Sequence, residues 1–335
     1  MKNLINIATE EQPFFIDPVS VTALFTNSKE GALTVYNEKG VLLWINYKSY
    51  KVDPDKLLEK LAEAGNPLIS LPARESGKEY PYYIAPSAVM YATVTTVTAK
   101  GDMGAIIGIK GAGRHESYGT KPEEFQALLG GMKAAGKTML EYTPDVAYAR
   151  WHDAAMLYID PAAITSIRDD GLQLNIYFGD SDLLDVQVKL SQEKKQQIHD
   201  TLIGHLTKES SLNSIVDLLK VVPRALDEEE SQARRNVAAA IAAANRALIP
   251  VTNTLHRGVY VRPEDVNYVT FYDDKKDTRP EGKYEMRLHR QKAGSTYHDT
   301  LNVYFNSAAA RTESFEALMG TKKPSSPKKD PGQTP

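Results

Sequence analysis

The chain has 335 residues, of which 42% are hydrophobic and 25% charged, and its formal net charge is −3. This composition predicts a globular protein with real cores, and its weakly acidic balance argues against a general binder of nucleic-acid phosphates, which needs a basic face. The absence of cysteine excludes disulfides, thiolate metal sites and a cysteine nucleophile, and it fits a reducing compartment.

A short phrase recurs four times along the chain. In each copy an aromatic residue, a β-branched residue and one further residue precede a proline, and apolar residues follow three and six positions after it. Each phrase is followed by two β-rich runs separated by a turn, and then by a helical run. The sequence therefore predicts an α+β fold of four tandem β-β-β-α repeats, which carry Pro18, Pro86, Pro161 and Pro263.

The first two repeats are expected at 13–66 and 81–135, within a first half that spans 1–145. The helix of the first repeat should begin at Asp53, since aspartate is a good N-cap and a proline follows it in the first turn. One such unit has only a marginal core. We therefore expect neighbouring units to pack together as antiparallel sheets with helices on one face.

The second half is expected at 151–320 and contains an additional helical stretch. Apolar residues at helical spacing predict one helix that ends at Pro223 and a second, alanine-rich helix over 227–249. The second helix either braces the fold or provides a surface for self-association or another partner. The predicted parts of this half are repeats at 156–206 and 258–319 and a helical insert at 209–250.

The second and fourth repeats share a long hairpin tip that contains glycine together with basic and aromatic residues. Such a tip can hold phosphate and stack a base, so these hairpins are the main candidates for ligand binding. The alternative is a solvated hairpin with ordinary surface charge. The candidate residues are Arg114, His115 and Tyr118 in the second repeat, and Arg287, His289, Arg290, Lys292, Tyr297 and His298 in the fourth.

Residues 131–138 match the spacing of a phosphate-binding loop. In that interpretation the backbone around Gly131 and Gly136 holds phosphates, Lys137 contacts the outer ones, and Thr138 binds magnesium. The context is unfavourable, because a helical run precedes the motif and no strand leads into it. We therefore favour a helix that ends at Gly130 and Gly131, followed by a flexible linker.

No other pattern predicts catalysis, a metal site or a cofactor. The histidines lack the spacing of metal ligands on one element, and the paired acids Asp169 and Asp170 fall where a turn is expected. Trp44, Tyr47 and Tyr50 are expected to pack on the neighbouring unit. Residues 321–335 are rich in Pro, Lys and Ser and should be a disordered tail.

These patterns favour a non-enzymatic binding or scaffold protein. Its ligand would be a small anion or a protein partner, held by the long hairpins of the second and fourth repeats. A nucleic-acid-binding protein that uses the same hairpins and the basic tail is the alternative, and a nucleotide-binding enzyme is less favoured. No apolar run approaches the roughly 20 residues of a membrane span, and no signal peptide is visible, so we expect a soluble, cytoplasmic protein.

Overall fold

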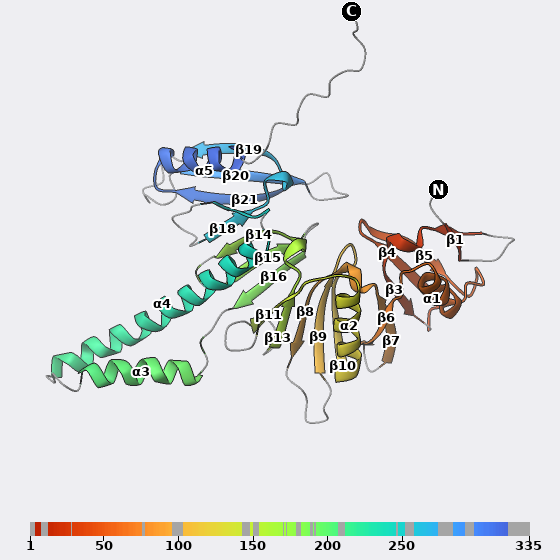
Figure 1. Cartoon of the computed structure of the whole chain (residues 1–335), viewed down its shortest axis with the longest axis horizontal. Coiled ribbons are helices and arrows are strands. Elements are labelled where there is room, and N and C mark those ends of the chain that lie inside the picture. Colours follow the sequence, from red (N-terminus) through yellow and green to blue (C-terminus); the bar gives the residue numbers. More distant parts are fainter. Residues whose placement is uncertain are drawn as a thin grey trace, which may run out of the picture.

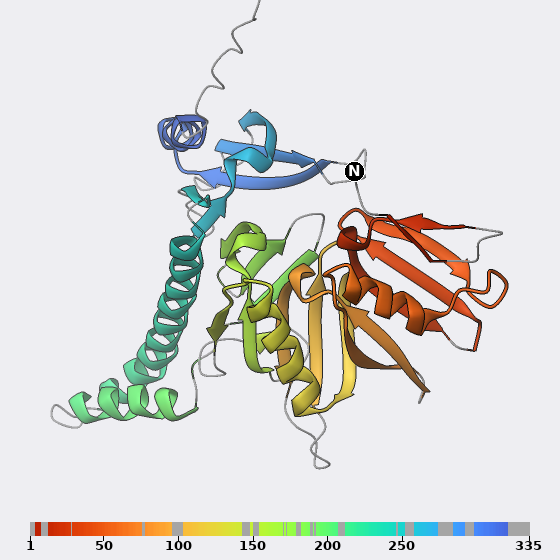
Figure 2. The same cartoon turned by 45° about the vertical axis from the view of Figure 1, so that its right-hand side comes forward.

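A computed structural model of the chain shows an α+β fold with several antiparallel sheets and helices packed on them (Figures 1 and 2). No helix in the described part of the chain is long and apolar enough to cross a lipid bilayer. The described residues are 4–7, 13–27, 29–75, 78–95, 103–142, 148–149, 154–169, 171, 173–178, 182–187, 190, 192–206, 212–245, 247–251, 258–273, 284–291 and 298–320.

We divide the described chain into four segments, 4–66, 68–137, 139–245 and 248–320. Each segment opens with a two-stranded antiparallel hairpin, and a short 3-10 turn that begins at a proline follows its second strand. The hairpins are β1 (Ile5–Asn6) with β2 (Phe15–Ile16), β6 (Ile69–Glu75) with β7 (Lys78–Ile84), β11 (Leu140–Tyr142) with β13 (Ala154–Ile159), and β17 (Ile249–Val251) with β18 (Gly258–Val261). The turns are η1 (Pro18–Ser20), η2 (Pro86–Ala88), η3 (Pro161–Ala163) and η4 (Pro263–Asp265).

A three-stranded antiparallel meander follows each turn, and one or two helices complete the segment. The meanders are β3 (Val21–Asn27), β4 (Ala32–Asn37) and β5 (Gly40–Asn46); β8 (Val89–Thr95), β9 (Met103–Ile109) and β10 (Gly113–Thr120); β14 (Ile164–Asp169), β15 (Leu174–Phe178) and β16 (Asp182–Gln187); and β19 (Val266–Asp273), β20 (Tyr284–Gln291) and β21 (His298–Phe305). The helices are α1 (Pro54–Glu63), α2 (Pro122–Ala134), α3 (Gln192–Leu206), α4 (Leu212–Ala244) and α5 (Ala308–Gly320).

Local chemistry explains where these elements begin. Asp17 and Asp160 precede the prolines of η1 and η3, and each side chain accepts the backbone N–H two residues further on. Asp53 caps α1 in the same way by accepting the N–H of Asp55 at 3.1 Å, as predicted. The proline costs nothing at these positions, because the first N–H groups of a helical turn have no partner within it.

The hairpin of each following segment extends the meander sheet of the segment before it. The strand orders are β5-β4-β3-β7-β6, β10-β9-β8-β13-β11 and β12-β16-β15-β14-β18-β17, in which β12 (Tyr148–Ala149) is an additional edge strand. The register of the three junctions is the same. The residue three positions before the proline lies opposite the residue six positions after the preceding proline, which gives Tyr83 opposite Leu24, Tyr158 opposite Ala92, and Tyr260 opposite Ile167.

Each hairpin also belongs to the core of its own segment. One apolar cluster joins Ile16 of β2, Leu24 and Leu33 of the first meander, and Leu57 and Leu61 of α1. The other three clusters likewise combine a hairpin, the meander that follows it and a helix. Each of the last three hairpins is therefore hydrogen-bonded to one meander and packed on the next, which couples neighbouring segments.

In the third segment, the sheet is covered by the C-terminal end of α4. Val237 and Ile241 of this helix lie in the core with Ile164 and Ile167, while α3 and the start of α4 project as an arm (Figures 1 and 2). The predicted helix end at Pro223 is wrong, because α4 runs through this residue. Pro223 is exposed, so water can bond the carbonyl group that the missing N–H leaves without a partner.

Two further expectations differ from the structure. The predicted helix end at Gly130 and Gly131 is wrong, since α2 continues to Ala134. A Cβ atom on Gly131 would lie 2.6 Å from Ile69 and 2.8 Å from Pro86, so this glycine allows α2 to approach its neighbours. Trp44 was expected to pack on the next segment, but 67% of its surface is exposed.

Candidate binding site

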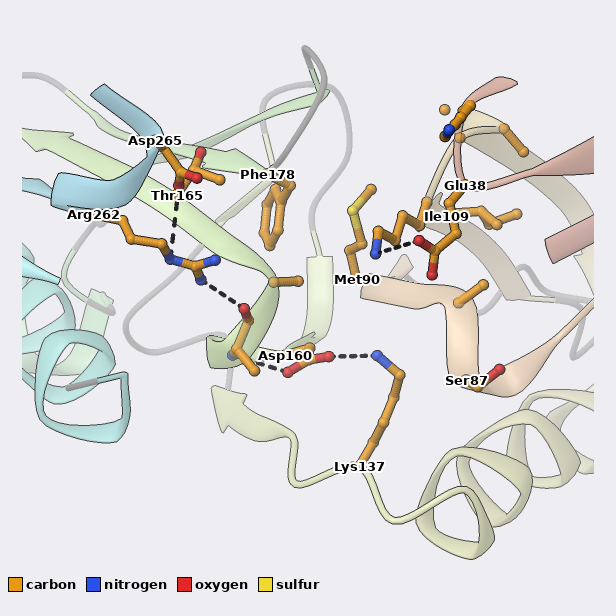
Figure 3. A pocket seen from close by; sticks show the side chains of 18 residues that line it. Glu38, Ser87, Met90, Ile109, Lys137, Asp160, Thr165, Phe178, Arg262 and Asp265 are labelled. Atoms are coloured by element: carbon orange, nitrogen blue, oxygen red, sulfur yellow. Dashed lines mark hydrogen bonds and ion pairs between the residues drawn. The ribbon is translucent and has the colours of Figure 1, made fainter. Parts of the chain in front are cut away.

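A cavity of about 650 Å³ lies where the proline turns of the second, third and fourth segments approach the β4–β5 turn of the first (Figure 3). Met90, Ile109 and Phe178 form its apolar wall. Its charged residues include one more cation than carboxylate: Lys39, Lys110, Lys137 and Arg262 against Glu38, Asp160 and Asp265.

Asp160 is held rigidly at the centre of this cavity. One carboxylate oxygen accepts the N–H of Ala162 at 3.0 Å, and the backbone N–H of Asp160 donates to the carbonyl of Met90 at 2.8 Å. The second carboxylate oxygen pairs with the ammonium group of Lys137, and both side chains are largely buried. A charge pair that is fixed in this way contributes to the shape of the cavity as well as to its charge.

Two of the three remaining cations, Lys110 and Arg262, are held with different strength. Lys110 pairs with Glu38 at 3.0 Å, and about half of each side chain is exposed, at 51% and 61%. Arg262 donates to the carbonyls of Ala162 at 2.7 Å and Ile164 at 2.8 Å. Exposed ion pairs contribute only about 0–1 kcal/mol, so an entering anion can draw Lys110 away from Glu38 at less cost than Lys137 from Asp160.

The motif at 131–138 does not adopt the geometry of a phosphate-binding loop. Gly131 lies within α2, Gly136 follows the helix with a φ of +78°, and Thr138 is exposed on the link to β11. A phosphate loop presents the N–H groups of a helix start, whereas this segment contains a helix end. Lys137 nevertheless lines the cavity, where its partner is Asp160.

The hairpin residues of the second segment interact mainly with their own sheet. Arg114 bonds the carboxylate of Glu116 at 2.5 Å. His115 stacks on Tyr82 with ring centroids 3.9 Å apart, and burial lowers the pKa of His115 to about 4, although Glu116 acts in the opposite direction. Tyr118 lies in β10, and its side chain is outside the described residues.

The fourth segment shows a similar arrangement. Arg287 bonds Glu285 at 2.9 Å and lies over the ring of Tyr272 at 4.9 Å. His289 stacks on Tyr268 with centroids 4.2 Å apart and contacts the hydroxyl groups of two threonines. Only the backbone of Arg290 and His298 is described, and Lys292 and Tyr297 lie outside the described residues.

The structure therefore places the described hairpin candidates in separate sheets, those of the second segment on β10 and those of the fourth on β20 and β21. The neighbouring tip residues, Lys110 to Gly113, do line the cavity. Glu38, Asp160 and Arg262 were not predicted to be site residues from the sequence. Asp160 and Arg262 precede the prolines of two repeated phrases, and this shared position was the available signal.

No group of metal-ligating side chains was found among the described residues. No protein-family model matches this chain, and no curated protein has a significantly similar sequence.

Proposed function

We propose that the chain is a non-enzymatic binding protein made of four copies of one unit. The unit is a hairpin, a proline turn, a three-stranded meander and a helix. The common junction register supports this reading. So does the register shift between the third and fifth residues after each proline, at Val21/Ala23, Val89/Tyr91, Ile164/Ser166 and Val266/Tyr268.

Buried asparagines support the same equivalence. The side-chain amide of Asn66 donates to the carbonyls of Pro18 at 2.7 Å and Val21 at 2.9 Å. Asn245 makes the corresponding bonds to Pro161 at 2.8 Å and Ile164 at 3.2 Å. Each asparagine follows the helix that covers its own sheet and ties the start of the next unit to the proline turn.

The cavity between the turns is the proposed binding site, and its ligand is a small anionic molecule. The observation that carries this proposal is that one cavity is lined by residues from all four segments. Its volume of about 650 Å³ is within the usual range of small-molecule sites. Lys110 and Lys39 supply the charge for the ligand, since Asp160 and backbone carbonyls already hold Lys137 and Arg262.

The alternatives have less support from the geometry. Arg114 and Arg287, two of the cations proposed for nucleic-acid binding, are each bonded to a carboxylate two residues away on the same strand. The 131–138 segment lacks the helix start that nucleotide binding requires. A small-molecule site therefore uses more of the observed contacts than either alternative.

Calorimetry and native mass spectrometry with inorganic phosphate, citrate and a nucleoside monophosphate test the proposal. At least one of these anions should bind, and Lys110→Ala should weaken its binding about tenfold or more, as expected for a charged hydrogen bond. Lys133→Ala is the matched control, because Lys133 is exposed on α2 and does not line the cavity. No binding by any of the three probes, or equal losses in both variants, would contradict the proposal.

A further inference from the structure

The two ends of the described array carry complementary halves of one junction. The hairpin β1–β2 forms a two-stranded sheet by itself, whereas the other three hairpins each extend a meander. At the other end, β19–β20–β21 is the one meander whose described sheet includes no hairpin from a following segment. Residues 321–335, predicted from the sequence to be a disordered tail, lie outside the described residues.

Exposed apolar side chains gather on these two ends. Among the described residues, the large hydrophobic side chains that are exposed all belong to the first and fourth segments. Terminal units of a repeat array normally present a polar outer face, so exposed apolar residues on β2 and β19, at the two ends, indicate a contact surface. The exposed residues are Leu4, Phe15, Val19, Val41, Leu42, Trp44 and Tyr50 in the first segment, and Tyr268, Phe271, Tyr272 and Met319 in the fourth.

At the internal junctions, the strand that receives a hairpin has a buried residue at a fixed position after the proline. The fifth residue after the proline is fully buried in the first three segments, at 0% exposure for Ala23, Tyr91 and Ser166. The equivalent residue of the fourth segment, Tyr268, is 46% exposed. At the other end of the array, Phe15 of β2 holds the position that Tyr83, Tyr158 and Tyr260 hold in the other hairpins, and it is 59% exposed.

We infer that a second copy of this chain docks head to tail, with its β1–β2 hairpin added to the β19 edge of the first copy. The internal register places Phe15 of one copy opposite Val269 of the other, as Tyr83 lies opposite Leu24. This inference uses the repeat equivalence proposed above, but it does not depend on the cavity or its ligand.

The chain itself identifies the occupant. Each internal junction is closed by a hairpin of this same sequence, whose second strand leads directly into a proline turn. Phe15-Ile16-Asp17-Pro18 repeats the pattern of Tyr158-Ile159-Asp160-Pro161, which closes the second junction. The β1–β2 hairpin therefore carries the same sequence pattern as a hairpin that closes an internal junction.

This contact joins different surfaces of the two copies. Such a heterologous contact leaves one acceptor edge and one donor hairpin exposed, so association continues until a ring closes or an open filament forms. An exposed strand edge is the surface on which strand addition is expected.

Cysteine cross-linking tests the register directly, because the chain contains no cysteine. Full-length Phe15→Cys and full-length Val269→Cys are mixed under mild oxidation. Directly opposed residues of antiparallel strands have Cα atoms about 4.5–5.5 Å apart, within the range that a disulfide bridges. A mixed disulfide dimer should form in several-fold higher yield than with Lys56→Cys, an exposed residue of α1, in place of Phe15→Cys.

Sedimentation of the unmodified chain over a range of concentrations provides the second measurement. The average mass should rise with concentration, and Phe15→Lys should lower the apparent association constant at least tenfold. Val41→Lys is the matched control, since Val41 is 61% exposed but lies on β5, which is neither the proposed donor strand β2 nor the proposed acceptor strand β19.

Several outcomes would overturn the inference. A chain that stays monomeric up to about 1 mM has no useful affinity for itself. Equal effects of Val41→Lys and Phe15→Lys would indicate general apolar association, and disulfide yields equal to those of the Lys56→Cys control would contradict the register. By contrast, loss of association in Phe15→Lys with retained anion binding would support the inference independently of the proposed function.

Discussion

Replacing Arg234 tests whether α4 is the helix that completes the third segment. The guanidinium Nε of Arg234 donates to Asp169 of β14 at 3.1 Å, and the two side chains are 4% and 1% exposed. A second guanidinium nitrogen donates to Ser231 at 2.9 Å. Arg234→Ala would leave the Asp169 carboxylate buried without its charge partner, which costs about 3–5 kcal/mol.

Urea unfolding followed by circular dichroism measures this loss. With a slope of about 2 kcal/mol per molar urea, the midpoint of the transition that includes this segment should fall by about 1.5–2.5 M. Arg235→Ala is the control, since Arg235 bonds only the exposed Gln232 among the described contacts, and it should change stability by less than about 0.5 kcal/mol. Arg234→Met combined with Asp169→Leu should recover most of the loss, because an apolar pair does not bury an unpaired charge.

Equal destabilisation by Arg234→Ala and Arg235→Ala would refute this role of Arg234. That result would mean that the end of α4 does not cover the sheet in solution. A large effect of Arg234→Ala without recovery in the double variant would instead assign the cost to packing around the guanidinium group.

Three further predictions follow from the described contacts. Burial lowers the pKa of His115 to about 4, so between pH 6.5 and 4 the unfolded state binds more protons than the folded state. The free energy of unfolding should therefore fall as the pH decreases from 6.5 to 4, by at most about 1.4 kcal/mol per pH unit. His115→Phe should flatten this part of a pH-dependent unfolding curve. Asn66→Ala and Asn245→Ala should each cost about 2 kcal/mol in chemical denaturation, because each removes two bonds to buried carbonyls, and a large effect at only one site would argue against their equivalence. Gly111→Ala should lower the thermal midpoint more than Gly113→Ala. Both glycines have a φ of +75°, but only at Gly111 would a Cβ atom clash with the first segment, 1.8 Å from a backbone oxygen. Equal losses would show that the two hairpin tips do not touch.

The recurring proline phrase predicted more of the fold than any other sequence feature. It located all four 3-10 turns, and the strand on each side of it is present in the structure. The leading strand of each unit was missed, although a repeated dipeptide marks it at Leu4-Ile5, Leu68-Ile69 and Leu248-Ile249. These strands are short and lie next to loops of varying length, so their periodicity alone gives a weak signal.

The candidate site was harder to predict for a physical reason. Lys137 was noticed because it matched a phosphate-loop motif, but its role in the structure depends on Asp160, 23 residues further along the chain. Arg262 reaches the carbonyls of Ala162 and Ile164, about a hundred residues away. A motif reports local spacing, whereas this cavity is formed by turns from different segments.

The sequence by itself determined the local structure of this protein. Prolines fix the backbone at the start of each turn, aspartates such as Asp17 and Asp160 cap it, and alternating apolar residues define the strands that follow. Only the tertiary structure decided that each hairpin joins the sheet of the preceding segment and that α4 supplies the third covering helix. These choices depend on hydrogen bonds and apolar contacts between residues far apart in the chain, and no local pattern encodes which distant strand edge will be available.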